Sequence, residues 1–479
     1  MRYRLALITV VATAALSASA AAMTHPPDPG GDGTSATTPA PTPGTPSSPS
    51  APGSAVFVLT GSGYGHGVGL SQYGAQAQAQ AGRTLADILG FYYPGTTLGP
   101  SPKTSVRVLL APAAPTLTVS SPAPFTVRDA NGASAALPAG AVALGPDLQV
   151  SVDGSSVALV APLTFAPAAG ELLSLGAKSY RGRIEIASAG AGLQAVNIVA
   201  LDSYVQGVVP GEMPSSWAAA ALEAQAVAAR SYAVASIVKG KAWDLYPDGR
   251  SQQYLGAAAE TPQTTAAVKV TARRVLLYAG KVALAFYSSS SGGQTTSALD
   301  AFGVDLPYLP SQPDPWDSAS PNHIWPTKSL TGLQLAKALG MRSAVAEVRS
   351  QVSSSLRVAT LVAIAADGSS LELSGAEIRK RLTLRSTFFR LGTLRFVTSP
   401  SPTTTGTKVR LAGLARDVQA AVLERLGAAG QWISVVPHLA VQADGSFATV
   451  VRPKQTTTYR LSASGLPGPQ LTIPVVAAS

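Results

Sequence analysis

The sequence contains no cysteine in its 479 residues. Disulfide bonds, a thiolate nucleophile, a cysteine-ligated zinc ion and a lipid-modified cysteine are therefore excluded. Charged residues are scarce at 13%, whereas hydrophobic residues make up 46%, which excludes a disordered chain. The 45 glycines and 37 prolines exclude a coiled coil or long-helix protein. The length suits two or three domains, and the formal charge of +10 favours acidic partners without naming one.

Long apolar runs are also rare, and the one at the N-terminus is short. Arg2 and Arg4 precede an apolar run from Leu5 to Leu16, and small residues follow up to residue 22. A membrane-spanning helix needs roughly 20 apolar residues, so the pattern predicts a secretory signal peptide over 1–22 and an exported protein. An uncleaved N-terminal anchor is the alternative, and it also places the rest of the chain outside the membrane.

Two segments lack large apolar residues. Residues 23–55 are rich in Pro, Ser, Thr, Gly and Ala and predict an extended spacer. Residues 398–406 predict a second, shorter linker. The folded part is thereby divided into a body, 56–397, and a C-terminal segment, 407–479.

Helix and strand patterns are mixed within the body. Helices are predicted at 72–81, 84–92 and 216–239, the last being rich in alanine. Strands are predicted throughout 104–200, and alternation in 407–479 predicts a small β-sandwich. The expected fold class is therefore α+β: a mixed helix and strand body with a β-rich subdomain, plus a small C-terminal all-β, immunoglobulin-like domain.

A glycine-rich segment, residues 61–75, precedes the first predicted helix. Its alternating glycines permit close backbone approach, and its groups able to make specific polar contacts are His66 and Gln72. The segment lacks the βαβ context of a dinucleotide-binding loop and the Gly-Lys-Ser/Thr ending of a phosphate loop. His66 is either a ligand-contacting or a structural residue, and spacing alone favours the structural role.

A single carboxylate stands between two prolines in Val208-Val-Pro-Gly-Glu-Met-Pro214, ahead of the long predicted helix. Proline fixes φ, so the loop that presents Glu212 is predicted to be stiff. Apolar neighbours, Met213 and Trp217 among them, would raise the pKa of Glu212 as a general acid requires. The nearby helix N-terminus would lower that pKa. The sequence leaves open which effect is larger, and whether Glu212 is only a helix-start residue.

A predicted strand at 282–287 runs into the turn Ser288-Ser-Ser-Ser-Gly-Gly293. Such a turn is typical either of a ligand-contacting loop or of a solvated one. The sequence has no Gly-x-Ser-x-Gly elbow, so a serine hydrolase is a poor interpretation.

Together these segments resemble the stage II sporulation protein D / LytB (SpoIID/LytB) family of bacterial cell-wall proteins. The resemblance covers roughly 56–397 and rests on Gly63-Tyr-Gly-His-Gly-Val-Gly-Leu-Ser-Gln-Tyr-Gly-Ala75, Tyr204-Val-Gln-Gly-Val-Val-Pro-Gly-Glu-Met-Pro-Ser-Ser-Trp217, Glu223-Ala-Gln-Ala-Val-Ala-Ala-Arg-Ser-Tyr232, Tyr287–Gly293 and Leu382-Thr-Leu-Arg-Ser-Thr-Phe-Phe389. In many members the Gly-His-Gly segment lies near the C-terminal end of the domain, whereas here it comes first. A circular permutation accommodates this order if the termini lie close together.

The resemblance implies a lytic transglycosylase that cleaves MurNAc–GlcNAc bonds of peptidoglycan strands already stripped of stem peptides. The alternative that it implies is a non-catalytic, peptidoglycan-binding enhancer of the amidase that strips them. It maps the family's catalytic glutamate onto Glu212. One carboxylate is then sufficient, because the 6-hydroxyl of the sugar attacks the anomeric carbon in place of water. Glu212 would protonate the leaving oxygen and then accept the 6-hydroxyl proton.

The same resemblance suggests substrate contacts in all three segments: Tyr204, Gln225, Arg230, Tyr232, His66, Gln72, Ser288, Ser289, Ser290 and Ser291. Four basic residues, Arg379, Lys380, Arg381 and Arg385, are candidates for contacts with the free lactyl carboxylates of a peptide-free strand. A solvated basic face is an equal alternative for those four.

Some family members carry a zinc-binding loop with cysteines and a histidine. Residues 243–256 of this chain contain neither residue type, so we expect no zinc of that kind and no cofactor. The expected partners are peptidoglycan glycan strands and, under the alternative, an amidase or another wall enzyme; no nucleic acid is expected. A surface protein that uses 407–479 for adhesion is a third possibility.

Overall fold

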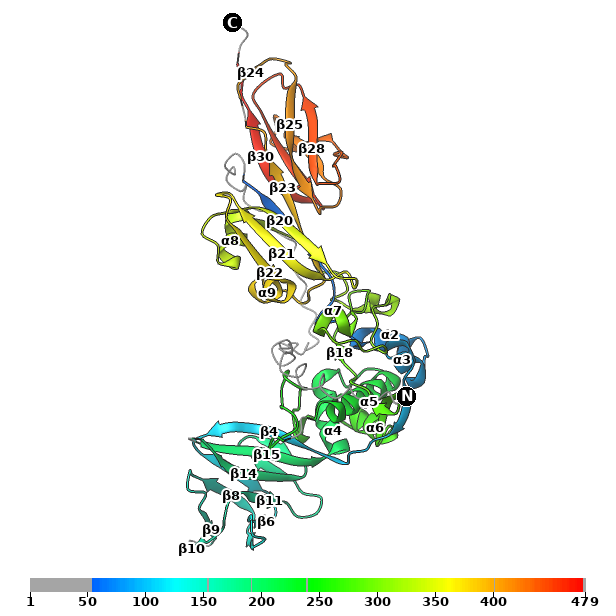
Figure 1. Cartoon of the computed structure of the whole chain (residues 1–479), viewed down its shortest axis with the longest axis vertical. Coiled ribbons are helices and arrows are strands. Elements are labelled where there is room, and N and C mark those ends of the chain that lie inside the picture. Colours follow the sequence, from blue (N-terminus) through cyan, green and yellow to red (C-terminus); the bar gives the residue numbers. More distant parts are fainter. Residues whose placement is uncertain (1–53, 153–154, 191, 238–239, 400, 477–479) are drawn as a thin grey trace, which may run out of the picture. The chain divides into compact units, whose positions relative to one another are not determined.

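A computed structural model describes residues 54–476, except for 153–154, 191, 238–239 and 400 (Figure 1). The predicted signal peptide and nearly all of the predicted spacer lie outside the described residues. Contacts divide the described chain into two compact units: unit 1 holds residues 67–290 and 295–320, and unit 2 holds residues 54–66, 291–294 and 321–476. Glu212 belongs to unit 1.

Between residues 105 and 200, the described part of unit 1 consists of strands and their turns. An antiparallel six-stranded sheet has the order β4-β15-β14-β11-β6-β7, and a four-stranded sheet has the order β13-β12-β5-β8 (Figure 1). Strand β15 leads directly into helix α4, so this sheet anchors the start of the helix that ends at Glu212. The bounds are β4 (Ser105–Ala114), β5 (Leu117–Ser121), β6 (Phe125–Arg128), β7 (Ser134–Leu137), β8 (Gly140–Leu144), β9 (Val150–Val152), β10 (Ser155–Val157), β11 (Leu163–Ala166), β12 (Leu173–Leu175), β13 (Lys178–Tyr180), β14 (Arg183–Ala189) and β15 (Gly192–Ala200).

Helices and short strands form the rest of unit 1. The helices are α2 (Gln72–Gln80), α3 (Leu85–Tyr92), α4 (Leu201–Glu212), α5 (Ala219–Ala235), α6 (Pro262–Val270) and α7 (Ala298–Phe302), with 3₁₀ turns η1 (Ala257–Ala259) and η2 (Pro315–Ala319). The short strands are β2 (Leu70–Ser71), β3 (Thr97–Pro100), β16 (Arg274–Tyr278), β17 (Lys281–Val282) and β18 (Tyr287–Ser288).

The first two helices lie where the sequence predicts them, and the long helix is shorter than predicted. Helices α2 and α3 begin at side-chain caps, because Ser71 and Thr84 each accept a hydrogen bond from a backbone N–H in the first turn. Helix α5 begins three residues late, at Ala219. Its predicted first turn is occupied by a tighter turn, in which Trp217 N–H donates to Pro214 O at 3.0 Å.

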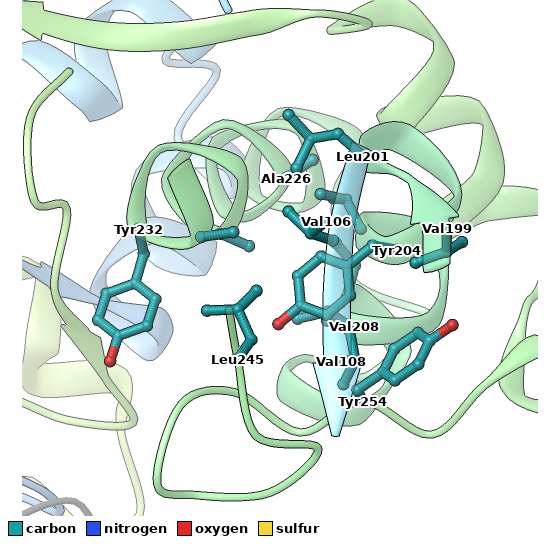
Figure 2. Close-up of a cluster of buried hydrophobic side chains, with 14 of the residues drawn as sticks. Val106, Val108, Val199, Leu201, Tyr204, Val208, Ala226, Tyr232, Leu245 and Tyr254 are labelled. Atoms are coloured by element: carbon teal, nitrogen blue, oxygen red, sulfur yellow. The ribbon is translucent and has the colours of Figure 1, made fainter. Parts of the chain in front are cut away.

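One hydrophobic core joins the helices of unit 1 to the six-stranded sheet. Helix α4 buries Leu201, Tyr204 and Val208 on one face, as their spacing of three and four residues requires. Figure 2 shows Tyr204 beside Val208 and the β4 side chains, with the ring of Tyr254 next to it. The Tyr204 and Tyr254 ring centroids are 5.0 Å apart. This packing fixes the axis of α4 and, with it, the position of Glu212.

Strands make up most of unit 2. Its main sheet has the order β19-β1-β23-β25-β28, and smaller sheets have the orders β20-β21-β22 and β27-β26-β29-β30. The bounds are β1 (Val56–Gly61), β19 (Lys328–Thr331), β20 (Val345–Val352), β21 (Val358–Ala365), β22 (Ser370–Ser374), β23 (Phe389–Phe396), β24 (Thr403–Thr404), β25 (Val409–Arg416), β26 (Val422–Leu426), β27 (Trp432–Val436), β28 (Ser446–Val451), β29 (Thr457–Ala463), β30 (Leu466–Ile473) and β31 (Val475–Val476), with helices α8 (Gly332–Leu339) and α9 (Gly375–Arg381).

The main sheet of unit 2 crosses the predicted boundary between the body and the C-terminal segment. Strand β23 lies before the predicted linker and β25 after it, yet the two pair from Thr393↔Arg416 to Phe396↔Gly413. The segment after residue 407 is therefore hydrogen bonded to the body as one sheet. Its immunoglobulin-like topology stays a prediction.

The fold class is mixed α and β, with more strand than helix, which is compatible with the predicted α+β class. In the part of the chain that the structure describes, no helix is both long enough and apolar enough to cross a membrane.

Candidate active site

Glu212 is the last residue of helix α4. The flanking prolines predict a loop at this position, and that prediction is wrong. The helix continues through Pro210 and Gly211, where a Cβ on Gly211 would lie 2.8 Å from Gln253 O. Close packing on the segment around Gln253 therefore overrides the helix-breaking tendency of proline and glycine. Because the C-terminal end of a helix carries partial negative charge, α4 disfavours the ionised carboxylate of Glu212. The sequence predicts that the N-terminal end of the long helix lowers the pKa of Glu212. The C-terminal end of α4 acts against that effect.

Burial dominates the electrostatics of Glu212 and raises its pKa to about 7. Hydrogen bonding acts in the other direction: Gln253 N–H donates to Glu212 Oε1 at 2.9 Å. The Tyr287 hydroxyl and the Gln72 side chain, which lie against the carboxyl, also lower the pKa in part. The sequence alone does not decide between these opposing effects on the pKa of Glu212. In the structure the effect of burial is the larger. The residue as a whole is half-buried.

A chain of hydrogen bonds with a fixed direction leads to Tyr287. Tyr204 Oη donates to Gln252 Oε1 at 2.9 Å, and Gln252 Nε2 donates to Tyr287 Oη at 2.8 Å. Since Tyr287 Oη accepts from Gln252, its own proton is available for the nearby Glu212 carboxylate. Burial raises the pKa values of both tyrosines well above their usual range, so both remain protonated donors.

Gln72 is brought to the carboxyl by a two-residue pairing of distant segments. Strands β2 and β18 pair in parallel, with Leu70 opposite Tyr287 and Ser71 opposite Ser288. Gln72 follows directly as the first residue of α2, and only 6% of it is exposed. Its Nε2 atom makes no hydrogen bond of good geometry, so an amide donor is available beside Glu212.

Two further predicted residues come from helix α5. Tyr232 is buried against Phe286, with ring centroids 5.7 Å apart, and burial together with the charge of Glu212 raises its pKa to about 12. Gln225 is fully buried, and neither atom of its amide has a hydrogen-bond partner among the described residues. Tyr232 therefore lies within electrostatic reach of Glu212, whereas Gln225 has no exposed surface for a sugar.

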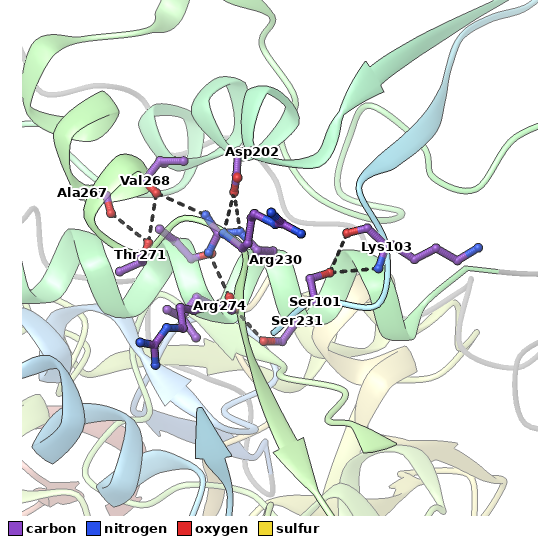
Figure 3. A network of polar contacts seen from close by, with 12 residues as sticks. Ser101, Lys103, Asp202, Arg230, Ser231, Ala267, Val268, Thr271 and Arg274 are labelled. Carbon is purple, nitrogen blue, oxygen red and sulfur yellow. Dashed lines mark hydrogen bonds and ion pairs between the residues drawn. The ribbon is translucent and has the colours of Figure 1, made fainter. Parts of the chain in front are cut away.

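Arg230 has a structural role in place of the predicted glycan contact. Its side chain is fully buried, and Nε donates to Asp202 Oδ1 at 2.8 Å (Figure 3). The other guanidinium nitrogens donate to the backbone carbonyls of Ala226, Val268 and Arg274 at 3.1–3.4 Å. Arg230 thus ties α5 to α4, α6 and β16, because a buried guanidinium must find acceptors within the protein.

The serine-rich turn is divided between the units. Ser288 is buried, and its Oγ has no partner among the described residues. Ser290 Oγ donates to Asp317 Oδ2 at 2.8 Å, and Ser289 O accepts from Tyr73 N–H at 3.1 Å. Ser291 belongs to unit 2, where its carbonyl accepts from Arg357 at 3.0 Å. These contacts describe a well-ordered turn and not a fully solvated loop.

His66 and the four basic candidates also belong to unit 2. The glycine-rich backbone next to His66 is held there, since Gly63 O accepts from Trp325 Nε1 at 2.8 Å and Gly65 N–H donates to Arg385 O at 3.0 Å. Three of the basic side chains are used in local contacts: Arg379 with Leu384 O, Arg381 with Leu339 O, and Arg385 with Asn322 Oδ1. Their role in glycan binding, like that of His66, stays a prediction.

The described residues hold no group of three or more His, Asp or Glu side chains arranged to bind a metal ion. The chemistry that the site offers by itself is proton transfer. Glu212 can give and take a proton near neutral pH, with Gln253 N–H, Tyr287 and Gln72 around it.

Sequence reasoning names Gln72 but misses Gln253 and Tyr287, the other two residues that hydrogen bond to the carboxyl. Gln252, Gln253 and Tyr254 belong to a Gln-x-Tyr-x-Gly segment ending at Gly256, and that segment is the signal that could have drawn attention to them. Tyr287 had been considered only as the start of the serine turn. Its role depends on Gln252, 35 residues away in the sequence, which no local pattern reveals.

Comparison with known proteins gives partial matches that include the site. A family model described as stage II sporulation protein (SpoIID) matches residues 189–278. The stage II sporulation protein D of Bacillus subtilis is 32% identical over 217 residues, which cover 41% of this chain and 61% of that protein. The amidase enhancer of Bacillus subtilis is 38% identical over 113 residues, 24% of this chain and 15% of that protein. A protein of Brachyspira hyodysenteriae described as uncharacterized is 39% identical over 117 residues, 24% of this chain and 32% of that protein.

The chain thus spans at most about three-fifths of the length of these relatives. The family model covers α4 with Glu212, α5 and the Gln-x-Tyr-x-Gly segment, whereas Gln72 and Tyr287 lie outside the matched residues. These matches confirm the resemblance to the SpoIID/LytB family on which the sequence analysis depends, and the family model locates it in residues 189–278.

Proposed function

We propose that this chain is an exported peptidoglycan lytic transglycosylase. It cleaves MurNAc–GlcNAc bonds of peptide-free glycan strands and leaves 1,6-anhydro ends. Export is supported by the signal-peptide pattern over 1–22, and a cell-wall role by the names of the relatives. The observation that carries the catalytic proposal is the single buried carboxyl of Glu212, whose pKa of about 7 allows it to act as an acid near neutrality.

In the first half of the reaction Glu212 donates its proton to the glycosidic oxygen, and the bond from that oxygen to the anomeric carbon breaks. Gln253 N–H donates to Oε1, which favours Oε2 as the oxygen that carries the acid proton. As the proton leaves, the Tyr287 hydroxyl and Gln72 stabilise the carboxylate, because hydrogen bonds to the charged form favour it.

In the second half the Glu212 carboxylate accepts the proton of the 6-hydroxyl of the same sugar, whose oxygen bonds to the anomeric carbon. The nucleophile is already attached to the substrate, so the protein does not need a second carboxylate to activate water. Glu212 returns to its protonated form, and no cofactor enters the balance. General acid–base assistance of this kind contributes about 10²–10⁴-fold to the rate.

The test is release of 1,6-anhydro products from peptide-free glycan by the full chain and by Glu212→Gln. We expect the substitution to abolish release while glycan binding survives, because glutamine keeps the shape but cannot donate the acid proton. Glu223→Gln, a second partly buried glutamate in unit 1, is the matched control and should retain turnover. Equal turnover by Glu212→Gln and the wild type would overturn the proposal.

The second candidate is a non-catalytic protein that binds peptidoglycan and enhances an amidase. The relative whose name is amidase enhancer favours it. Under this candidate, Glu212→Gln would stimulate an added wall amidase as well as the wild type does, and neither protein would cut glycan alone. Under the transglycosylase proposal, the wild type cuts peptide-free strands with no amidase present.

A further inference from the structure

An aromatic pair lies close in sequence to Gln72 and Glu212, and the proposed mechanism does not use it. The rings of Tyr73 and Trp217 meet edge to face, with centroids 5.0 Å apart and planes at 63°. Tyr73 follows Gln72, whose side chain lies against Glu212, and Trp217 lies five residues after Glu212. Both residues are only half-buried, so part of each is exposed, and Trp217 also packs against the hydrophobic core of unit 1.

The pair is held by contacts outside its own rings. Gln76 Oε1, one turn along α2 from Tyr73, accepts a hydrogen bond from Ala218 N–H at 2.9 Å. The Trp217 backbone closes a turn onto Pro214 O at 3.0 Å, and Tyr73 N–H donates to Ser289 O at 3.1 Å. The backbones of both residues are therefore fixed before a ligand arrives, which lowers the entropy cost of binding.

The two segments that carry the pair contain no charged residue. Helix α2 reads Gln-Tyr-Gly-Ala-Gln-Ala-Gln-Ala-Gln, and residues 213–222 contain no Asp, Glu, Lys or Arg. Half-exposed aromatic residues with amides and hydroxyls nearby are suited to an uncharged ring of a ligand that is apolar on one face and polar at its edge. A pyranose ring has this character, because its axial C–H bonds form an apolar face and its hydroxyls lie around the rim.

We propose that Tyr73 and Trp217 form a glycan-binding subsite next to Glu212, on which a sugar ring neighbouring the scissile bond stacks. The inference rests on the proposed function, since it assigns a subsite to the same glycan strand. The indole of Trp217 is the stacking surface, and the ring of Tyr73 packs against it at an angle of 63°. Binding energy gained there holds the strand so that the scissile oxygen reaches the Glu212 proton.

The test is the affinity of a peptide-free GlcNAc–MurNAc oligosaccharide, measured by calorimetry in the Glu212→Gln background so that no turnover interferes. We expect Trp217→Ala to weaken binding about tenfold or more, and Trp217→Phe to weaken it less because a smaller ring remains. Trp243→Ala is the matched control: Trp243 and Tyr246 form a second edge-to-face pair in unit 1, with centroids 6.2 Å apart. It should bind the oligosaccharide like the parent.

Thermal unfolding of each variant shows whether folding is retained, and Trp217→Phe provides a folded comparison if Trp217→Ala is unstable. Parent-like affinity in folded Trp217→Ala would overturn the subsite while leaving the proposed function standing. Equal weakening by Trp217→Ala and Trp243→Ala would also overturn it, because the effect would not be specific to the pair. If Glu212→Gln itself fails to bind the oligosaccharide, both the proposed function and the proposed subsite are contradicted.

Discussion

The raised pKa of Glu212 makes a quantitative prediction about the pH dependence of glycan cleavage. A general acid works only while protonated, so kcat/KM should follow the protonated fraction of Glu212 in the free enzyme. With a pKa of about 7, that fraction falls about tenfold between pH 6 and pH 8. A glutamate with the ordinary pKa of 4.5 would instead lose about 25-fold between pH 4 and pH 6.

The assay is the initial rate of 1,6-anhydro product release from peptide-free glycan, measured at low substrate concentration over a series of buffers. We expect an approximately constant rate between about pH 5 and pH 6 and a tenfold fall per pH unit well above pH 7. Glu223→Gln is the control for assignment, because burial also raises the pKa of Glu223, and its profile should match the wild type. A rate already falling near pH 4.5, or a fall that Glu223→Gln removes, would refute the reasoning.

Three further predictions concern the same unit. Glu212→Gln should raise the free energy of unfolding by up to about 3 kcal/mol at pH 8 and by little at pH 4. The pKa of the carboxyl rises from 4.5 to about 7 on folding, so the wild-type protein loses stability as the pH increases through that window, whereas the amide has no charge to bury. Equal unfolding midpoints at pH 8 would contradict this. Tyr287→Phe should move the basic limb of the pH–rate profile to higher pH, because it removes a hydrogen bond that lowers the pKa of Glu212, and an unmoved limb would show that Tyr287 does not act on the carboxylate. Arg230→Met should cost about 3 kcal/mol or more in urea unfolding, because it removes a buried guanidinium that bonds to Asp202 and to three backbone carbonyls. Arg250→Met, from an ion pair exposed by 46% on each side, should cost below about 1 kcal/mol, and similar losses would contradict the structural role of Arg230.

Local features of the fold could be read from the sequence because short-range chemistry determines them. Helices α2 and α3 begin where Ser71 and Thr84 can accept hydrogen bonds from the first-turn backbone. Their side-chain oxygens lie within three residues of the groups they satisfy, so a linear pattern is enough to find them. The alanine-rich composition of α5 is also a local signal, so the sequence predicts this helix. Its predicted ends, 216 and 239, differ from the observed Ala219 and Ala235.

The catalytic role of Glu212 stays a prediction, and of its surroundings the sequence names Gln72 but not Gln253 or Tyr287. The motif resemblance led to Glu212, yet its helical setting depends on close packing of Gly211 against the backbone near Gln253. The hydrogen bonds from Tyr204 through Gln252 to Tyr287 join segments up to 48 residues apart. No periodicity or local propensity encodes such contacts, since they exist only after the chain has folded.

The boundary before the C-terminal segment illustrates a different difficulty. The Pro, Ser and Thr run at 398–406 has the composition of a linker, and composition alone predicts a break between domains. In the structure β23 and β25 flank that run and pair in one sheet. Whether two strands pair depends on their register and on which side chains they bury. The composition of residues 398–406, which lie between β23 and β25, carries no information on either.

The central claim is that Glu212 transfers one proton while the sugar closes a ring upon itself, with no water consumed. The most direct test is digestion of peptide-free glycan in water enriched in heavy oxygen, followed by mass spectrometry of the new ends. The account predicts anhydro ends that carry no heavy oxygen, and loss of those ends in Glu212→Gln. Reducing ends labelled with heavy oxygen would contradict it, because they would show that water, and not the 6-hydroxyl, is the nucleophile.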